Sequence, residues 1–230
     1  MRIVVFGATG MAGREVVTEA LRRGHSVVAA SRRGGAPGDQ DLTRLALDVA
    51  DGAAASAALT GADAAVLAIR PAPGEEARLA PLTHGVLDAA ARHGARVLIV
   101  GGAAPLRSPN HPDRLLIDDP AFVPEAWRRI AAASLEQLRV CEAHPAADWV
   151  YLSPAAQFEP GDPRGRYRRG ETTLLTDAAG RSRIAAADLA LAVLDELEHP
   201  SGERHFTVAE APAPPSPVGA ARMTFGDGGV

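Results

Sequence analysis

Three glycines close to the start of the chain constrain its fold more than any other feature. Gly7, Gly10 and Gly13 have the spacing G-x-x-G-x-x-G and directly follow the apolar run 3–6. A continuous apolar run with β-branched residues suits a parallel strand that is buried on both faces. Apolar residues then recur at helical spacing over 11–23. The sequence therefore predicts a strand, a tight glycine turn and a helix that begins at the turn.

Short apolar runs and helical segments continue to alternate along most of the chain. This alternation is typical of a parallel sheet with helices on both faces. The sequence thus predicts an α/β fold: a Rossmann-type doubly wound parallel sheet in a single domain. The further predicted strands are 26–30, 45–47, 64–69, 96–100, 149–152 and 205–208, and the predicted helices are 51–60, 76–93, 124–143 and 185–198.

The predicted domain covers residues 1–210. Loops on the substrate side are expected at about 103–123 and 155–183, because ligands of a doubly wound sheet bind beyond the carboxyl ends of its strands. Residues 211–230 are rich in proline and glycine. A segment of this composition cannot form a regular strand ladder, so we expect a flexible tail.

Composition excludes several classes of protein. Hydrophobic residues make up 47% and charged residues 23%, which argues against a disordered chain. The net charge of −4 argues against a nucleic-acid partner. No apolar run approaches the ~20 residues of a membrane span, and the glycine-rich N-terminal region does not resemble a signal peptide. We therefore expect a cytoplasmic protein with no membrane partner. The single cysteine, Cys141, excludes an intramolecular disulfide, and no residue spacing predicts a metal site.

Lysine does not occur in the chain, so all 24 residues counted as Lys plus Arg are arginines. This excludes reactions that require a lysine, such as Schiff-base chemistry and attachment of pyridoxal phosphate. It also excludes the P-loop phosphate clamp and the Tyr-x-x-x-Lys pair of common short-chain dehydrogenases.

The glycine turn has the chemistry of a dinucleotide-binding site. Gly7 permits the tight turn, Gly10 lets the backbone approach a pyrophosphate, and Gly13 allows close packing of helix against strand. The N-terminus of the helix adds free N–H donors and a partial positive charge. A glycine-rich turn without a ligand is the alternative. The residues predicted to bind the cofactor here are Gly7, Thr9, Gly10, Met11, Ala12 and Gly13.

The end of the second predicted strand indicates which cofactor binds. NAD sites usually place an acidic residue there, to accept from the ribose 2′-hydroxyl. Here the strand leads into Ser31, Arg32 and Arg33, and no acidic residue occurs before Asp39. Guanidinium groups bind a 2′-phosphate, whereas a carboxylate repels it. The sequence therefore predicts NADP(H), unless both arginines are merely solvated loop charges.

Two residues after the third strand are predicted to contact the adenine. In this architecture Asp48 can accept from the exocyclic amine, and Val49 can pack on the ring. The alternative is that Asp48 caps the next helix, but Asp51 is better placed for that role.

These motifs together resemble a known family. The opening 7–14 (Gly-Ala-Thr-Gly-Met-Ala-Gly-Arg), Ser-Arg at 31–32 and Leu-Asp-Val at 47–49 are similar to the atypical short-chain dehydrogenases/reductases. This is the NAD(P)H-binding, NmrA-like family, which includes small bacterial oxidoreductases and biliverdin-IX-beta/flavin reductase. Val-Gly-Gly-Ala at 100–103 and Leu-Ser-Pro-Ala at 152–155 extend the resemblance, which covers roughly 1–210.

The resemblance implies further cofactor contacts at the ends of later strands. Two loops would flank the ribose and nicotinamide, and the sixth strand would face the nicotinamide. The first loop contains Ala68, Ile69 and Arg70, the second contains Gly101, Gly102 and Ala103, and the sixth strand leads into Pro154, Ala155 and Ala156.

The chain departs from this family where a proton donor would be expected. Alanines 103–104 replace the Ser or Thr that many relatives carry there, and Trp127 occupies the place of a tyrosine. General acid catalysis of carbonyl reduction typically contributes ~10²–10⁴-fold. Tyr151 is predicted to be a core residue, whereas Tyr167 could line a pocket but lacks an evident activator. The catalytic residues are therefore unknown, and a conjugated acceptor suits this chain better than a simple ketone.

Three residues are candidates for contact with the substrate. His111 lies in the loop after the fifth strand, and Trp127 and Phe158 could stack on a planar acceptor. The ordinary alternatives are a turn residue for His111 and core positions for both aromatics. Asp188 is expected to cap the last helix.

The leading hypothesis is an NADPH-dependent oxidoreductase that transfers hydride to a small conjugated acceptor of the flavin or quinone type. The alternatives are an NADP(H)-binding regulatory or sensor protein without turnover, an epimerase- or dehydratase-like enzyme, and a specialised biosynthetic reductase. We expect a small-molecule substrate and a monomer or homodimer.

Overall fold

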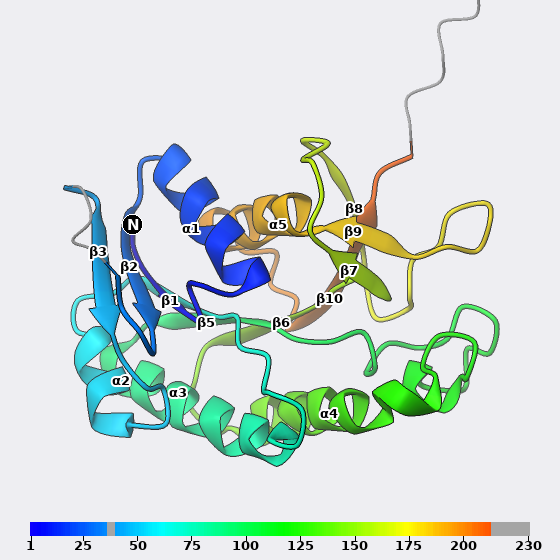
Figure 1. The fold of residues 1–230 in the computed structure, drawn as a ribbon, viewed down its shortest axis with the longest axis horizontal. Helices are drawn as coiled ribbons and strands as arrows, with labels where there is room; N and C mark the ends of the chain where they lie inside the picture. Colours follow the sequence, from blue (N-terminus) through cyan, green and yellow to red (C-terminus); the bar gives the residue numbers. More distant parts are fainter. Residues whose placement is uncertain (36–39, 213–230) are drawn as a thin grey trace, which may run out of the picture.

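A single sheet of eight strands forms the centre of the computed structural model, which describes residues 1–35 and 40–212 (Figure 1). The strand order is β3-β2-β1-β4-β5-β6-β10-β8, and only the β10–β8 pair is antiparallel. This topology confirms the predicted Rossmann-type α/β fold. Asp39 and residues 213–230 of the predicted tail lie outside the described residues. The strands of this sheet are β1 Arg2–Phe6, β2 Ser26–Ser31, β3 Leu42–Ala46, β4 Ala64–Leu67, β5 Arg96–Val100, β6 Trp149–Ser153, β8 Tyr167–Gly170 and β10 His205–Glu210.

Helices cover both faces of the sheet. Figure 1 shows α1 (Met11–Arg22) and α5 (Ala186–Glu198) on one face, and α2 (Gly52–Ala58), α3 (Leu79–His93) and α4 (Arg128–Ala143) on the other. Side chains of β1 alternate between the two cores that result: Ile3 and Val5 pack with α1 and α5, whereas Val4 and Phe6 pack on the opposite side. Burial on both faces explains why the predicted strands read as continuous apolar runs.

Bounds differ from the sequence predictions chiefly at an edge of the sheet. The third strand was predicted over 45–47, but β3 begins at Leu42 and ends at Ala46. It pairs only with β2, and most of its side chains are exposed or half-buried, so polar residues are tolerated there. Asp51 caps α2 as expected, because its side chain accepts from the N–H groups of Ala53 and Ala54.

The segment 155–183 contains strands that its composition does not indicate. β7 (Gln157–Glu159) pairs with β9 (Arg183–Ala185), and the arginine- and glycine-rich β8 joins the main sheet beside β10. The expectation that Asp188 caps α5 is wrong. Its buried carboxylate accepts instead from the N–H groups of Arg164 and Gly165, and so ties the 160–166 loop to the helix.

A third, smaller core fixes the segment between β5 and α4. Leu106, Leu116 and Leu174 are buried there, and they link the 103–123 loop to the 155–183 segment. This part of the chain also contains the short 3-10 helices η2 (Leu116–Asp118) and η3 (Glu125–Trp127), while η1 (Glu76–Arg78) precedes α3. Across the described residues, no helix combines the length and the apolar character that a bilayer span requires.

Candidate nucleotide-binding site

At the glycine turn, the backbones of β1, α1 and the segment after β4 approach one another so closely that a Cβ atom would not fit between them. Gly7 has a φ of +84°, and a Cβ at Gly7 would lie 2.3 Å from the carbonyl oxygen of Ala68. A Cβ at Gly13 would lie 2.2 Å from the carbonyl oxygen of Gly7. The N–H of Gly10 donates to that same carbonyl over 2.9 Å and closes the turn. Glycine is therefore required at positions 7 and 13 by the packing of the turn itself.

The N-terminus of α1 is open to an anionic group. Gly10 is its N-cap and supplies no side-chain hydrogen bond, and the first turn contains no acidic residue. The N–H groups of this turn consequently have no side chain that competes with a ligand, and the helix dipole favours negative charge at this end. A diphosphate fits such a site, because it is the group that glycine-rich turns before helices bind in dinucleotide folds.

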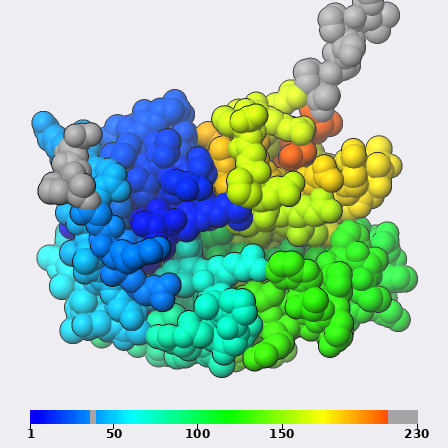
Figure 2. All heavy atoms as spheres, in the orientation of Figure 1, coloured from blue at the N-terminus to red at the C-terminus, as the bar shows by residue number. Residues whose placement is uncertain are grey.

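A pocket of about 210 Å³ lies beside this turn, at the carboxyl ends of β1 to β4. Figure 2 shows the blue and cyan atoms of these N-terminal segments meeting on the face turned to the viewer. The strand order reverses between β1 and β4, and ligands of open α/β sheets bind at such a switch point. The pocket is lined by Phe6, Gly7, Thr9, Gly10, Ala30, Ser31, Arg32, Leu47, Asp48, Val49, Ala68, Ile69, Arg70, Pro71, Ala72, Glu75, Arg78 and Leu82.

Half of the residues predicted to bind the cofactor line this pocket. They are Gly7, Thr9, Gly10, Ser31, Arg32, Asp48, Val49, Ala68, Ile69 and Arg70. Met11, Ala12 and Gly13 form the first turn of α1 next to the pocket. Arg33, although adjacent to Arg32 in sequence, does not line it. The two arginines therefore differ in their relation to the pocket, which the sequence did not distinguish.

The remaining predicted contacts lie further along the same edge of the sheet. Gly101, Gly102 and Ala103 follow β5, and Pro154, Ala155 and Ala156 follow β6. Drug-sized ligands usually occupy ~300–1,000 Å³, so the 210 Å³ pocket can enclose only part of a dinucleotide. It lies where the glycine turn meets Asp48 and Val49, the two residues predicted to contact the adenine.

Sequence reasoning missed the part of the wall that follows Arg70. Pro71, Ala72, Glu75 and Arg78 line the pocket from the segment that leads into α3, and Leu82 does so from the first turns of that helix. This segment contains no motif that predicts a binding role. Its place depends on contacts with distant residues.

Those contacts connect the pocket to the start of α4. The guanidinium of Arg70 lies 5.2 Å from the ring centroid of Trp127, in the geometry of a cation–π contact. Two residues further along the chain, Arg129 forms an ion pair with Glu76 over 3.5 Å. Trp127 is 52% exposed, which is unusual for so large an apolar side chain. A half-exposed aromatic ring thus packs against Arg70, a residue of the pocket wall.

A profile of NAD(P)H-binding proteins matches residues 7–200, which include the glycine turn and all of the pocket after Phe6. The chain belongs to the NAD(P)H-binding family. This assignment confirms the resemblance to atypical short-chain dehydrogenases/reductases. It is consistent with the open helix N-terminus, which suits a diphosphate.

Relatives of the family cover the chain almost from end to end. The uncharacterized protein YwnB of Bacillus subtilis is 37% identical over 216 residues, which are 92% of this chain and 100% of YwnB. A crystal structure of a candidate epimerase from Bacteroides thetaiotaomicron is 33% identical, with a TM-score of 0.83 over 92% of this chain and 97% of that one. A candidate NADH-flavin reductase from Streptococcus pneumoniae is 28% identical, with a TM-score of 0.81 over 92% and 100% of the two chains.

Both tyrosines of this family member lie away from the pocket. Tyr151 is fully buried in β6, where its hydroxyl donates to the carbonyl of Ser134 over 2.9 Å. Tyr167 lies on β8 and donates to Asp195 over 2.7 Å. Burial raises the pKa of both hydroxyls, and the hydrogen bond to Asp195 raises the pKa of Tyr167 further. Neither hydroxyl is placed or activated to give a proton to a ligand in the pocket.

The other candidate substrate residues are not gathered at the pocket. Phe158, on β7, is half-buried against the core of α1 and α5. His111 is exposed in the loop after β5, where its N–H donates to the hydroxyl of Ser108 over 3.3 Å. Only Trp127 is connected to the pocket wall, through Arg70.

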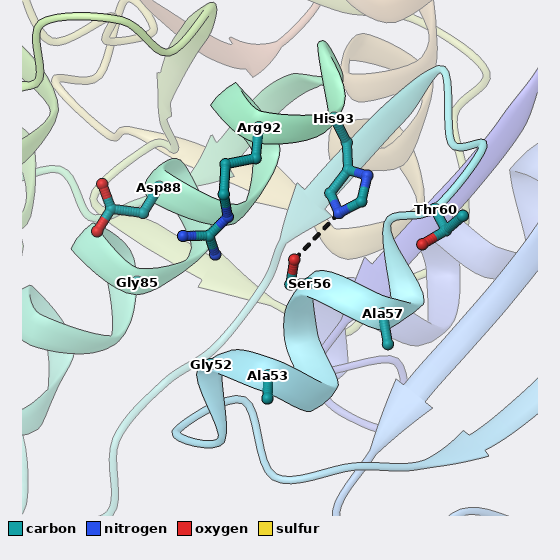
Figure 3. Close-up of a pocket in the computed structure, with 9 residues that line it drawn as sticks. All are labelled: Gly52, Ala53, Ser56, Ala57, Thr60, Gly85, Asp88, Arg92 and His93. Carbon is teal, nitrogen blue, oxygen red and sulfur yellow. Dashed lines mark hydrogen bonds between the residues drawn. The ribbon is translucent and has the colours of Figure 1, made fainter.

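A second hollow, of about 710 Å³, opens between α2 and α3 (Figure 3). Ser56 and His93 face each other across it, with 3.0 Å between the hydroxyl oxygen and Nε2. The hollow is lined mainly by short side chains, and it lies between helices rather than at the carboxyl edge of the sheet. None of the residues predicted to bind the cofactor lines this hollow.

Proposed function

We propose that the protein is an NADPH-dependent oxidoreductase whose cofactor lies across the carboxyl ends of β1 to β6. The diphosphate would bind at the N-terminus of α1, and the adenine would occupy the pocket against Val49 and Ile69. One carboxylate oxygen of Asp48 accepts from the N–H of Ala50 over 3.0 Å. The other oxygen is then available to accept from the adenine amine.

Arg32 supports the choice of NADPH over NADH. It lines the pocket beside Ser31, at the end of β2, where an NAD-binding protein usually carries an acidic residue. A guanidinium there can bind a 2′-phosphate through two parallel hydrogen bonds. We assign this role to Arg32 rather than Arg33, because Arg33 does not line the pocket.

The position of the two tyrosines carries the proposal about the acceptor. When bound, the reduced nicotinamide supplies a hydride. A simple ketone would also need a proton donor for the developing alkoxide. Tyr151 is sealed in the core, Tyr167 is paired with Asp195, and the chain has no lysine. A flavin or quinone spreads the developing charge over its rings and can take its proton from water, so positioning alone can supply most of the catalysis.

The contact between Arg70 and Trp127 is suited to such an acceptor. A planar ring can stack on the exposed face of Trp127, while Arg70 attracts negative charge on the acceptor. The related Streptococcus pneumoniae protein is described as a candidate NADH-flavin reductase, which agrees with this substrate class.

Oxidation of NADPH by a panel of acceptors tests the proposed reaction. Purified protein is mixed with NADPH and FMN, FAD, menadione or dichlorophenolindophenol, and the absorbance of reduced nicotinamide is followed. We expect turnover with at least one acceptor. The variant Trp127→Ala should raise the KM for that acceptor several-fold and the KM for NADPH by a smaller factor. It removes the whole stacking face from the acceptor, but only one contact of Arg70 from the pocket wall. Leu135→Ala, in the middle of α4, serves as the control for the loss of an apolar side chain in the helix that follows Trp127.

A regulatory protein that binds NADP(H) without turnover is the second candidate. The absence of a tyrosine from the pocket wall favours it. Tight binding of NADP⁺ together with no oxidation of NADPH by any acceptor of the panel would establish this function instead. Epimerase chemistry is a weaker candidate, although the related Bacteroides protein carries that description, because such enzymes usually need the missing Tyr/Lys pair.

A further inference from the structure

Two side chains from β6 form hydrogen bonds with the two backbone polar groups of Gly102. The N–H of Gly102 donates to the hydroxyl of Tyr151 over 3.3 Å. Its carbonyl accepts from the hydroxyl of Ser153 over 2.9 Å. Tyr151 and Ser153 are two residues apart on one strand, so their side chains lie on the same face of the sheet. The peptide units on both sides of Gly102 are thus held by side chains.

The packing around this peptide leaves no room for any residue but glycine. A Cβ at Gly101 would lie 2.0 Å from the ring of Tyr151, and a Cβ at Gly102 would lie 2.8 Å from the hydroxyl of Ser134. The ring of Tyr151 therefore supports the loop as well as accepting its hydrogen bond. The loop after β5 has one defined position, although it has no regular secondary structure.

A chain of buried hydrogen bonds fixes Tyr151 in turn. Its hydroxyl donates to the carbonyl of Ser134 over 2.9 Å, and the amide oxygen of Gln137 lies 3.3 Å away. The amide nitrogen of Gln137 donates to Thr83 over 3.0 Å, and the hydroxyl of Thr83 donates to the carbonyl of Leu79 over 2.8 Å. Residues of α3 and α4 are thereby connected to the loop after β5. Buried networks in which every member is satisfied are rigid.

His205 fixes the hydroxyl of Ser153 from the other side. Its Nε2 lies 2.9 Å from that oxygen. Since the hydroxyl gives its proton to the carbonyl of Gly102, it must accept from His205, which requires a proton on Nε2. The ring of His205 packs against that of Tyr151 with a centroid distance of 5.4 Å.

We propose that Tyr151 and Ser153 are positioning residues, which hold the Gly102 peptide where the ribose and nicotinamide of the cofactor bind. The inference rests on the proposed function, because it assumes that the cofactor extends from the pocket at β1 to β4 past the end of β5. The two side chains are buried and touch no ligand themselves. They act through the backbone that they hold. Removal of either side chain should therefore weaken binding of the nicotinamide half of the cofactor and leave binding of the adenosine half unchanged.

Binding of the whole cofactor is compared with binding of its adenosine half. Calorimetry is carried out with NADP⁺ and with adenosine 2′,5′-bisphosphate, which has no nicotinamide. For Ser153→Ala and for Tyr151→Phe we expect the affinity for NADP⁺ to fall about tenfold, the factor that corresponds to roughly one lost hydrogen bond. The affinity for the bisphosphate should stay within a factor of about two of the wild-type value. A change of this size is smaller than the loss of one hydrogen bond would cause.

Two matched variants control for the loss of a buried or bonded hydroxyl. Thr207 pairs with Ser153 across β10 and β6, and its hydroxyl is buried with no hydrogen-bond partner in the part of the chain that the structure describes. Thr207→Val should therefore bind both compounds as the wild type does. Tyr167→Phe removes a tyrosine hydroxyl on the far side of the sheet and should also leave binding unchanged.

Hydrogen exchange gives a second readout that needs no ligand. In Tyr151→Phe the amide of Gly102 should exchange several-fold faster than in the wild type, because its acceptor is lost. The amide of Gly101 donates to the carbonyl of Leu152 over 3.0 Å and should keep its protection. Equal acceleration at both amides would indicate general loosening and would overturn the inference.

The binding results distinguish a failure of the positioning role from a failure of the proposed function. Equal losses of affinity for NADP⁺ and the bisphosphate, or no loss for either, would overturn the positioning role and leave the proposed cofactor site intact. If the wild-type protein bound neither compound, the proposed function would fail, and the positioning role with it.

Discussion

At the scale of single residues, the site depends on its glycines as much as on the side chains that line it. Gly7 and Gly13 allow β1, β4 and α1 to approach, and glycines 101–102 allow the loop after β5 to rest on Tyr151. The sequence alone predicted the first pair, because their spacing after an apolar run has a known physical purpose. It could not assign a packing reason to the second pair, because the side chains that a Cβ would meet there, Tyr151 for Gly101 and Ser134 for Gly102, lie far away in the sequence.

Two helical glycines provide a matched test of this view. A Cβ at Gly13, in α1, would lie 2.2 Å from a carbonyl oxygen, whereas a Cβ at Gly85, in α3, would meet nothing within 4 Å. Gly13→Ala should lower the free energy of unfolding by about 1–3 kcal/mol through overpacking. Gly85→Ala should raise it by about 0.5–1 kcal/mol, because alanine favours the helix. Urea denaturation measures both, and equal effects of the same sign would contradict the packing described for the turn.

His205 should make the stability of the fold depend on pH. Burial lowers its pKa from 6.5 to about 4. The folded state therefore takes up this proton at a lower pH than the unfolded state does. The free energy of unfolding should therefore be highest above pH 6.5 and should fall as the pH drops to about 4. The loss from this group is at most about 3 kcal/mol.

The variant His205→Gln isolates that contribution. Glutamine can still donate to Ser153 but takes up no proton in this range. Urea denaturation between pH 7 and pH 4.5 should show a smaller decline for the variant than for the wild type. Parallel curves for the two proteins would show that His205 does not titrate as its burial implies.

At the scale of elements, regular strands and helices were predictable and irregular connections were not. β1, β5 and α5 read as apolar runs or helical periods, because each packs against the core directly. β8 escaped prediction, since its Tyr-Arg-Arg-Gly sequence has no apolar alternation, and only pairing with β10 makes it a strand. The part of the pocket wall after Arg70 was not predicted for a similar reason, because contacts with the distant residues Trp127 and Arg129 hold it in place.

The loop before β8 should depend on one buried carboxylate. Asp188 accepts three short contacts, of 2.9, 3.2 and 3.0 Å, from the N–H groups of Arg164 and Gly165. Asp188→Ala leaves these donors without their partner and should lower the free energy of unfolding by about 1–3 kcal/mol. Limited trypsin digestion should then cut faster after Arg164 and Arg166. The control Asp162→Ala changes an exposed residue of the same loop and should leave the cleavage rate unchanged.

At the scale of the whole molecule, strand order determines where chemistry can take place. The sheet reverses its order between β1 and β4, so the open edge beside the glycine turn is the natural place for a dinucleotide. The sequence was sufficient to predict this architecture and ten of the residues that line the pocket. The proposed acceptor half would involve segments far apart in the chain, such as the start of α4 and the loop after β5. Their arrangement follows only from the packed structure.

Calorimetry with the two dinucleotides tests the central proposal most directly. NADP⁺ and NAD⁺ are titrated at low ionic strength into the wild type, Arg32→Ala and Arg33→Ala. We expect the wild type to prefer NADP⁺ and Arg32→Ala to lose about 10- to 100-fold in affinity for NADP⁺, as for the loss of a charge-assisted pair. Affinity for NAD⁺ should change little, and Arg33→Ala should resemble the wild type. No heat of binding for either dinucleotide, or equal losses for both in Arg32→Ala, would contradict it.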